Sequence, residues 1–535
     1  MAGGAEPVIA AARPPAGPLV WLAGGAALAL VLALTLGAVA LVALRAEGAG
    51  ALTAPDLRAL RFTAWQAFLS AALSVLLAIP LARALARRRF PGRGALVSLL
   101  GAPFLLPVIV AILGVIAIWG RSGWVNDGLG ALGAPRIDVY GLPGVLLAHV
   151  FFNLPLATRL ILQGYAEIPA ERWRLAAQLG IEGRALFRLL EAPMLRAVAP
   201  GAFALVFLIC ATSFAVALAL GGGPRATTLE LAIYQAMRFD FDLGRAALLA
   251  ALQFALCLGL ALLAAGLSAP AAFGPGFGAA PERWDGRGGM ARAADAALIG
   301  LGAVFLLSPL LAAFLHGIPG LGSMGAGVWA AAGRSLIVAL VAAALSLSLA
   351  GALAGLIVAL EARWAAAGRL AEALGLLTLA VSPFVAGVAL FLALRPFISP
   401  VSAALPLVAF VNALMALPFA LRLLLPPLRE AARDYGPLAA SLGMGAGARL
   451  RLVWLPRLRR PLGFAGGVAA ALAMGDLGVV ALFSAPGAPT LPLYMYGLIS
   501  AHRLEAAGGV ALLLAGLSFG LFAAFDAWGR ARDPA

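Results

Sequence analysis

The chain has 535 residues, of which 63% are hydrophobic and 11% are charged, and its mean hydropathy is +1.01. This composition excludes a soluble globular protein. All 38 basic residues are arginine, and the formal net charge is +15. Because the arginines lie between apolar segments and form no soluble basic face, the charge indicates orientation in a membrane and no nucleic-acid partner.

The residues that usually bind nucleotides or metals are scarce. A P-loop needs a lysine to reach the nucleotide phosphates, and this sequence contains none, so any ATP hydrolysis is expected to come from a partner. Cys210 and Cys257 fall inside apolar segments, where a thiol packs as a small hydrophobe. The three histidines are scattered. We therefore expect no catalytic residue, no metal site and no cofactor in this chain.

Apolar stretches long enough to cross a bilayer recur along the whole length, which predicts an all-α integral membrane protein. We predict twelve spans, at about 19–44, 62–81, 97–119, 140–163, 198–220, 246–268, 294–315, 335–358, 371–394, 404–425, 462–483 and 506–527. The lipid bilayer is thus the first expected partner.

The distribution of arginine predicts how these spans are oriented. With a cytoplasmic amino terminus, the cytoplasmic segments hold 25 arginines and the outer segments hold 9. This asymmetry places both termini in the cytoplasm. It also places there two long arginine-rich segments, the first loop (164–197) and the second loop (426–461).

A composition change in the middle of the chain divides it into two halves. Residues 269–293 are rich in Gly, Ala and Pro and lack helical apolar periodicity, so they predict a cytoplasmic linker. The chain is then expected to contain a first six-helix half (1–268) and a second (294–535).

The two loops repeat each other without a gap at a spacing of 263 residues, LAAQLGIEGRALFRLLEAPMLR at 175–196 and LAASLGMGAGARLRLVWLPRLR at 438–459. A parallel duplication of this kind implies two equivalent halves related by an axis along the membrane normal. The shared residues of interest are Ala176, Ala177, Leu179, Gly180 and Pro193 in the first loop and Ala439, Ala440, Leu442, Gly443 and Pro456 in the second.

This pattern predicts a short surface helix that ends at the glycine, followed by a membrane helix that begins near the proline. Small residues before the glycine allow another surface to approach closely. A loop that only fixes the membrane topology needs arginine. It does not require the same spacing of small residues, glycine and proline in both halves, so we favour a docking role.

At these residues the sequence resembles the "EAA" loop of bacterial ABC importer permeases. The resemblance rests on Gly180, Leu190, Ala192 and Pro193, and on Gly443, Val453, Leu455 and Pro456. It implies the type I importer permease fold and a coupling helix that docks on an ATPase subunit. The family's leading glutamate is replaced by Arg174 and Pro437, with Glu171 and Glu430 nearby. Docking by shape is therefore expected in preference to docking by charge.

Residues 211–237, ATSFAVALALGGGPRATTLELAIYQAM, and residues 474–497, MGDLGVVALFSAPGAPTLPLYMYG, are similar to the thiamine and thiamine diphosphate importer permeases. The resemblance implies a thiamine importer of the bacterial inner membrane, with one copy of this chain, two ATPase subunits that bind ATP and Mg²⁺, and a periplasmic binding protein. Fused permeases for ferric iron or phosphonate remain alternatives.

One acidic residue lies within a predicted span. Asp476 falls in 462–483, and its equivalent in the first half is Ser213, next to Phe214. Ser213, Phe214 and Asp476 are candidate pathway residues, because an acid and an aromatic ring can both contact a cationic thiazolium. We favour the alternative that Asp476 is hydrogen-bonded and fixes helix packing.

Two other classes of protein fit less well. A secondary transporter would be expected to carry several ion-coupling groups in the membrane, but Asp476 stands nearly alone and the two loops would have no role. A membrane enzyme would need clustered catalytic groups, and the sequence shows none.

Overall fold

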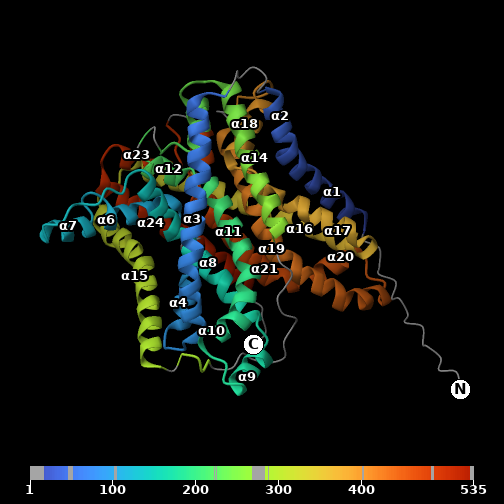
Figure 1. Ribbon diagram of the computed structural model, residues 1–535. Helices are drawn as coiled ribbons and strands as arrows, with labels where there is room; N and C mark the ends of the chain where they lie inside the picture. Colours follow the sequence, from blue (N-terminus) through green and yellow to red (C-terminus); the bar gives the residue numbers. More distant parts are fainter. Residues whose placement is uncertain are drawn as a thin grey trace.

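The computed structural model describes residues 17–45, 52–101, 105–221, 223, 226–267, 283–286, 288–399, 403–483 and 487–530. Within these ranges every regular element is helical (Figure 1). This agrees with the expected all-α fold. Most of the predicted linker, 269–282 and 287, lies outside the described residues.

The first half begins with one long bent helix and ends with another long helix. Its elements are α1 (Pro18–Leu32), the π-helical η1 (Ala33–Gly37), α2 (Ala38–Arg45), α3 (Ala54–Arg87), α4 (Arg93–Leu99), α6 (Val108–Trp119), α7 (Trp124–Ala131), α8 (Leu142–Glu167), α9 (Ala170–Gln178), α10 (Gly183–Leu186), the π-helical η3 (Phe187–Glu191), α11 (Ala192–Ala211), α12 (Ala215–Leu220), α13 (Leu229–Arg238) and α14 (Leu243–Leu267).

The second half follows a similar order of elements from its second helix onward, with a single helix in place of α8 and α9. Its elements are α15 (Gly289–Gly320), α16 (Gly327–Arg363), α17 (Ala365–Gly375), the 3₁₀-helical η5 (Leu376–Ala380), α18 (Pro383–Leu394), α19 (Ala404–Ser441), α20 (Ala446–Arg449), the π-helical η6 (Leu450–Trp454), α21 (Leu455–Met474), α22 (Gly478–Phe483), α23 (Leu491–Ser500) and α24 (Leu504–Arg530).

The described residues contain ten helices long and apolar enough to cross a membrane, and eleven if one bent pair counts as a span. That pair, Ala365–Thr378 and Pro383–Leu394, bends by 88° and occupies the predicted span 371–394. The predicted span 462–483 is also interrupted. It consists of α21, which carries three arginines near its start, a break after Gly475, and the short α22.

The predicted repeat is visible in matched hydrogen bonds. The Thr63 hydroxyl of α3 accepts a bond from the backbone N–H of Leu229, which opens α13, at 2.8 Å. In the second half, the Ser335 hydroxyl of α16 accepts a bond from the N–H of Leu491, which opens α23, also at 2.8 Å. Two helix starts are thus fixed in the same way by equivalent spans, as expected for a duplicated fold.

The first helix of each half packs against the other half. Helix α1 lies along α16, whereas α15 contacts α3 and α6 of the first half as well as α24 of its own half. Figure 1 shows α1 and α2 along the right edge beside α16, and α15 at the left beside α6. At one crossing, a Cβ added at Gly114 of α6 would lie 2.2 Å from the carbonyl oxygen of Pro309 in α15. Glycine is required there because the two backbones touch. The halves are therefore interlocked.

Candidate functional site: two matched loops and a contact between the halves

The first loop contains the short helix predicted from its sequence. Helix α9 (Ala170–Gln178) is followed by Gly180, whose φ is +62°. The N–H of Gly180 bonds to the carbonyl of Ala177 at 3.2 Å, and the N–H of Ile181 bonds to that of Ala176 at 2.9 Å. This pair of bonds is a Schellman C-cap, in which glycine adopts the left-handed conformation without a Cβ penalty.

The second loop ends its helix identically but begins it differently. Gly443 has a φ of +59°, and the N–H groups of Gly443 and Met444 bond to the carbonyls of Ala440 and Ala439 at 3.0 and 2.9 Å. The expectation of a separate short helix is wrong here. Helix α19 continues from the membrane span to Ser441 as one helix of 38 residues, with Pro426, Pro427 and Pro437 inside it. In the first half, Ile168 and Pro169 separate α8 from α9.

The two helix ends expose the same side chains. Leu175 and Leu179 are 55% and 64% exposed, and their equivalents Leu438 and Leu442 are 55% and 66% exposed. Ala176 and Ala439, between these leucines, are buried. Each loop thus presents two leucines outward from a helix that an alanine holds against the protein. Leu175 and Leu438 are not among the loop residues predicted from the sequence. Their identity at the 263-residue spacing of the repeat is the signal that could have indicated them.

Beyond each glycine, the chain returns to the membrane through a π-helical turn that the sequence did not predict. These turns are η3 and η6, which occupy equivalent positions at the 263-residue spacing. Pro193 and Pro456 lie within the first two residues of the helices that follow, as predicted. A π-helical turn is a costly local irregularity that often marks a functional site. In both halves, the same kind of irregular turn connects the loop to the membrane helix that follows it.

The described end of the linker contacts the first loop through a buried ion cluster. Glu191, whose side chain is fully buried, pairs with Arg83 of α3 and with Arg283 of the linker, each at 2.7 Å. The Arg283 guanidinium also lies 4.0 Å from the centre of the Trp173 ring of α9, within range of a cation–π interaction.

Asp285 extends the cluster by pairing with Arg283 and Arg87, each at 2.7 Å. Burial raises the pKa of Asp285, but hydrogen bonds and positive charge from Arg283 and Arg87 outweigh this effect and lower the pKa below its ordinary value of 3.8. The linker is therefore tied to α3 and α9 by charges that remain ionised at neutral pH.

A different set of charges supports the second loop. Arg429 of α19 pairs with Glu361, at the end of α16, and with Glu372 of α17. The equivalent of Glu191 is Trp454, which carries no charge. The two loops are therefore alike in their exposed ends and differ in how the rest of the protein holds them.

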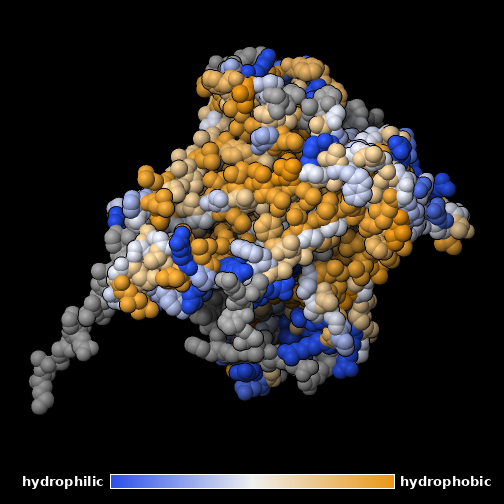
Figure 2. Space-filling view, turned by 180° about the vertical axis from the view of Figure 1, so that it is seen from behind, coloured by the Kyte–Doolittle hydropathy of each residue, from blue (hydrophilic) through white to orange (hydrophobic). Residues whose placement is uncertain are grey.

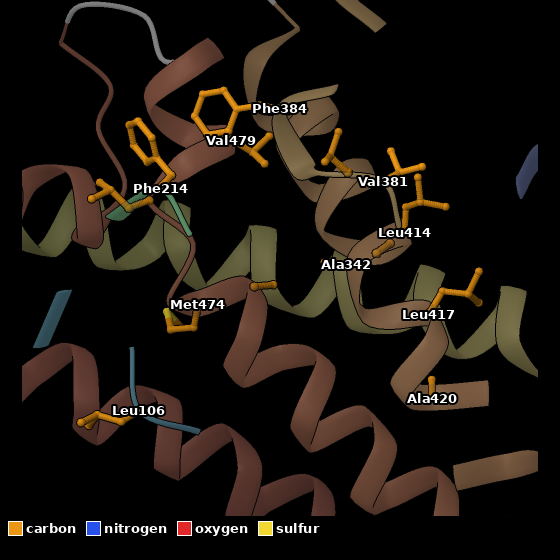
Figure 3. Packing of buried hydrophobic residues seen from close by; sticks show 14 of the residues in the cluster. Leu106, Phe214, Ala342, Val381, Phe384, Leu414, Leu417, Ala420, Met474 and Val479 are labelled. Carbon is orange, nitrogen blue, oxygen red and sulfur yellow. The ribbon is translucent and has the colours of Figure 1, made fainter. Parts of the chain in front are cut away.

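The candidate pathway residues lie where the two halves meet. Phe214, only 5% exposed, packs on Phe384 of the second half with ring centres 4.6 Å apart, and on Tyr234 at 5.2 Å. Figure 3 shows Phe214 and Phe384 side by side, with Val479 next to them. A Cβ added at Gly478 would lie 3.0 Å from the Phe384 ring and 3.6 Å from the Phe214 ring. The break after α21 thus adjoins this aromatic contact.

Asp476 lies in that break, where its carboxylate accepts hydrogen bonds. Its carboxylate accepts one from the Asn412 side chain of α19 and one from the backbone N–H of Val479 in α22, each at 3.3 Å. The second bond is the N-cap geometry that begins a helix. Ser213 precedes Phe214 at the equivalent place, where its N–H bonds to the Cys210 carbonyl at 3.4 Å.

The outer segment around Glu230 begins a short helix, α13, with a capping threonine. Thr228 caps α13, and its hydroxyl accepts a bond from the Leu231 N–H at 3.3 Å. Glu230 is fully buried. Its side chain therefore faces the protein interior and presents no outer surface.

Comparison with known proteins identifies the chain. No protein-family model matches it. It is 42% identical to the thiamine transport system permease protein ThiP of Brucella abortus (strain 2308) over 526 residues, 96% of each chain. It is 43% identical to the protein of the same description from Escherichia coli (strain K12) over 476 residues, 87% of this chain and 88% of that one. The Haemophilus influenzae protein of the same description is 36% identical over 470 residues, 86% of each.

The helical fold, with ten or eleven candidate spans among the described residues, together with these relatives, defines the class of the protein as an ABC importer permease. Within that class, the chain belongs to the family of thiamine transport system permease proteins, because the identity extends over most of its length.

Proposed function

We propose that this chain carries thiamine and its phosphates across the bacterial inner membrane by alternating access, driven by two copies of a separate ATPase. One observation carries the proposal. Both loops end in a Schellman-capped helix that exposes two leucines at matching positions, in a chain that belongs to the thiamine permease family. The relatives' descriptions favour thiamine over the ferric iron and phosphonate alternatives.

Two equivalent helix ends in one chain suit one ATPase subunit each, so a single copy of the chain serves two ATPases. ATP and Mg²⁺ are bound by those partners, since the chain has no lysine for a P-loop. Leu179 and Leu442 enter grooves on the ATPases, and Ala177 and Ala440 permit close approach. A periplasmic binding protein delivers the substrate from the opposite side. The positive-inside asymmetry supports a cytoplasmic location for both termini.

The transported molecule passes between the halves. In the conformation described here, the contact between Phe214 and Phe384 closes this route, and Asp476 fixes the start of α22 beside it. When the ATPases close, the two loops move together, and the π-helical turns pass the motion to α11 and α21. Those helices end next to Ser213 and Asp476, so the aromatic contact separates.

The test is ATP hydrolysis by the reconstituted importer, composed of this chain, its ATPase and its binding protein, with thiamine, thiamine diphosphate or ferric iron added in turn. Stimulation by the thiamine compounds alone is the expected result. Stimulation by iron would preserve the docking role of the loops and overturn the substrate. Uptake that continues without ATP would overturn the importer class.

A further inference from the structure

The second half contains a basic pocket beside the second loop. A cavity of about 920 Å³ lies between the ends of α19 and α24 and the start of α21. Arg451, Arg457, Arg459 and Arg460 line it, and Glu430 and Asp434 contribute two acids. Asp434 pairs with Arg433 at 2.9 Å. The cavity therefore has a surplus of positive charge.

Aromatic rings hold two of these arginines in place. The Arg457 guanidinium lies 3.7 Å from the centre of the Tyr435 ring. Arg459 lies 5.4 Å from the centre of the Trp528 ring, and its Nε donates a hydrogen bond to the Trp528 carbonyl at 3.1 Å. Among the described residues, neither Arg451 nor Arg457 forms an ion pair with a carboxylate. Their guanidinium groups can therefore bind an added anion without breaking a salt bridge.

An apolar groove adjoins the basic pocket. This groove, about 260 Å³, runs between α1, α16, α19 and α21, and its lining is entirely apolar, including Val20, Gly351 and Trp454. Leu455 and Leu462 line both the groove and the basic pocket. Figure 2 shows the same arrangement at large scale, with an apolar zone across the body of the molecule and hydrophilic side chains gathered toward its lower end.

We propose that these two cavities together bind one anionic phospholipid, with its phosphate on the arginines and an acyl chain in the groove. Basic pockets between membrane helices on the cytoplasmic side suit anionic lipid headgroups, and Trp528 is half exposed, as expected at a membrane interface. The lipid contacts the second loop from the membrane side and so holds η6 and α21 in position.

The repeat supports a dedicated site. Arg451 and Arg459 have equivalents in the first loop, Arg188 and Arg196. Arg457 and Arg460 do not, because Met194 and Ala197 occupy those positions. A topology signal shared by both loops explains the first pair of arginines, whereas the second pair occurs only in the second loop, beside the apolar groove.

The experiment measures lipid binding to the purified full-length chain by native mass spectrometry. Phosphatidylglycerol and phosphatidylcholine with identical acyl chains are titrated separately. We expect phosphatidylglycerol to bind about tenfold more tightly, because its headgroup carries a net negative charge that phosphatidylcholine lacks. R451Q/R457Q should abolish this preference, and R188Q/R196Q should retain it. R451K/R457K, which keeps the charge, should retain most of it.

A second pair of variants tests the groove. A Cβ at Gly351 or at Gly333, both in α16, meets nothing within 4 Å, so leucine fits at either position. G351L fills the groove and should weaken binding of both lipids, whereas G333L should not. Glycerol phosphate, which lacks acyl chains, should not compete. The proposal is overturned if R451Q/R457Q keeps the preference, if R188Q/R196Q loses it, or if glycerol phosphate competes as well as the lipid.

Discussion

Gly180 and Gly443, 263 residues apart, end their helices with φ angles of +62° and +59° and with the same pair of backbone hydrogen bonds. Apart from the adjoining backbone, no described residue has an atom within 4 Å of where a Cβ would stand at either glycine. The requirement for glycine is therefore conformational, and the open space beside it is available to a partner.

Gly443→Ala should weaken the link between ATP hydrolysis and substrate. An alanine in the left-handed region costs about 1–2 kcal/mol, so the helix end should shift while the membrane bundle stays folded. We expect lower thiamine-stimulated ATPase activity in the reconstituted importer and an unchanged melting temperature. Gly445→Ala is the matched control, since Gly445 has a φ of −64° and open space for a Cβ. An equal loss of thiamine-stimulated ATPase activity in both variants would show that coupling does not depend on the left-handed conformation of Gly443.

The exposed leucines should contribute directly to ATPase binding. Leu179→Asp and Leu442→Asp each place a charge in an interface that leucine would otherwise fill, and burying a leucine is worth about 1.5–3 kcal/mol. Each variant should reduce co-purification of the ATPase by more than about tenfold. The control is Leu132→Asp, because Leu132 is 83% exposed and lies outside both loops. Retention of the ATPase in the Leu179→Asp/Leu442→Asp double variant would contradict the docking proposal.

Arg283→Ala should release the first loop from the linker. It leaves the fully buried Glu191 with Arg83 as its remaining ion-pair partner and removes the cation from the Trp173 ring. Arg83 still pairs with Glu191, so the buried charge keeps a partner, but α9 loses its contact with the linker and its hydrogen exchange should become faster. Arg433→Ala is the control, because it breaks an exposed pair worth less than about 1 kcal/mol. Unchanged exchange in α9 would argue against the linker contact.

The contact of the linker residue Asp285 with Arg283 and Arg87 should weaken in acid and be unaffected by base. The pKa of Asp285 is lowered in the folded protein, so its contribution to stability is present above the ordinary value of 3.8 and is lost as the pH falls below it. Trp284 reports on this region, since its ring packs edge-on against Trp173. The fluorescence difference between wild type and Trp284→Phe should stay constant from neutral pH down to about 4 and then change. Asp285→Asn should abolish this transition, and a transition that persists in it must come from another group.

Much of the architecture was predictable because it depends on local patterns. Apolar stretches located the spans, and the gapless repeat located both loops and the glycine at each helix end. A π-helical turn differs from an α-helical one by a single added residue per turn, so apolar periodicity did not reveal η3 or η6. The continuity of α19 was likewise not predicted, because it contains prolines. Proline normally ends a helix unless neighbouring groups satisfy the backbone groups that it leaves without hydrogen bonds.

Contacts between segments distant in sequence were not predictable. The linker was expected to be a spacer on the basis of its glycine and proline, yet Arg283 and Asp285 contact α3 and η3 through charges that only the folded chain brings together. Likewise, nothing in the local sequence of Phe214 indicates its contact with Phe384. Long-range contacts of this kind follow from tertiary packing, which a pattern in one segment does not encode.

The role of Asp476 can be decided by an isosteric substitution. In Asp476→Asn, the amide oxygen can still accept the Val479 N–H, and the amide group can bond to the Asn412 side chain, so both hydrogen bonds survive without the charge. Because Asp476 caps α22, we expect this variant to transport thiamine within about twofold of wild type. Asp476→Ala removes the cap at a cost of about 1 kcal/mol and leaves Asn412 without its acceptor, so transport should fall. The measurement is thiamine uptake at varied concentration. If Asp476→Asn raises the half-saturating concentration about tenfold, the carboxylate must stabilise the cation by about 1.4 kcal/mol, and the pathway role would replace the packing role.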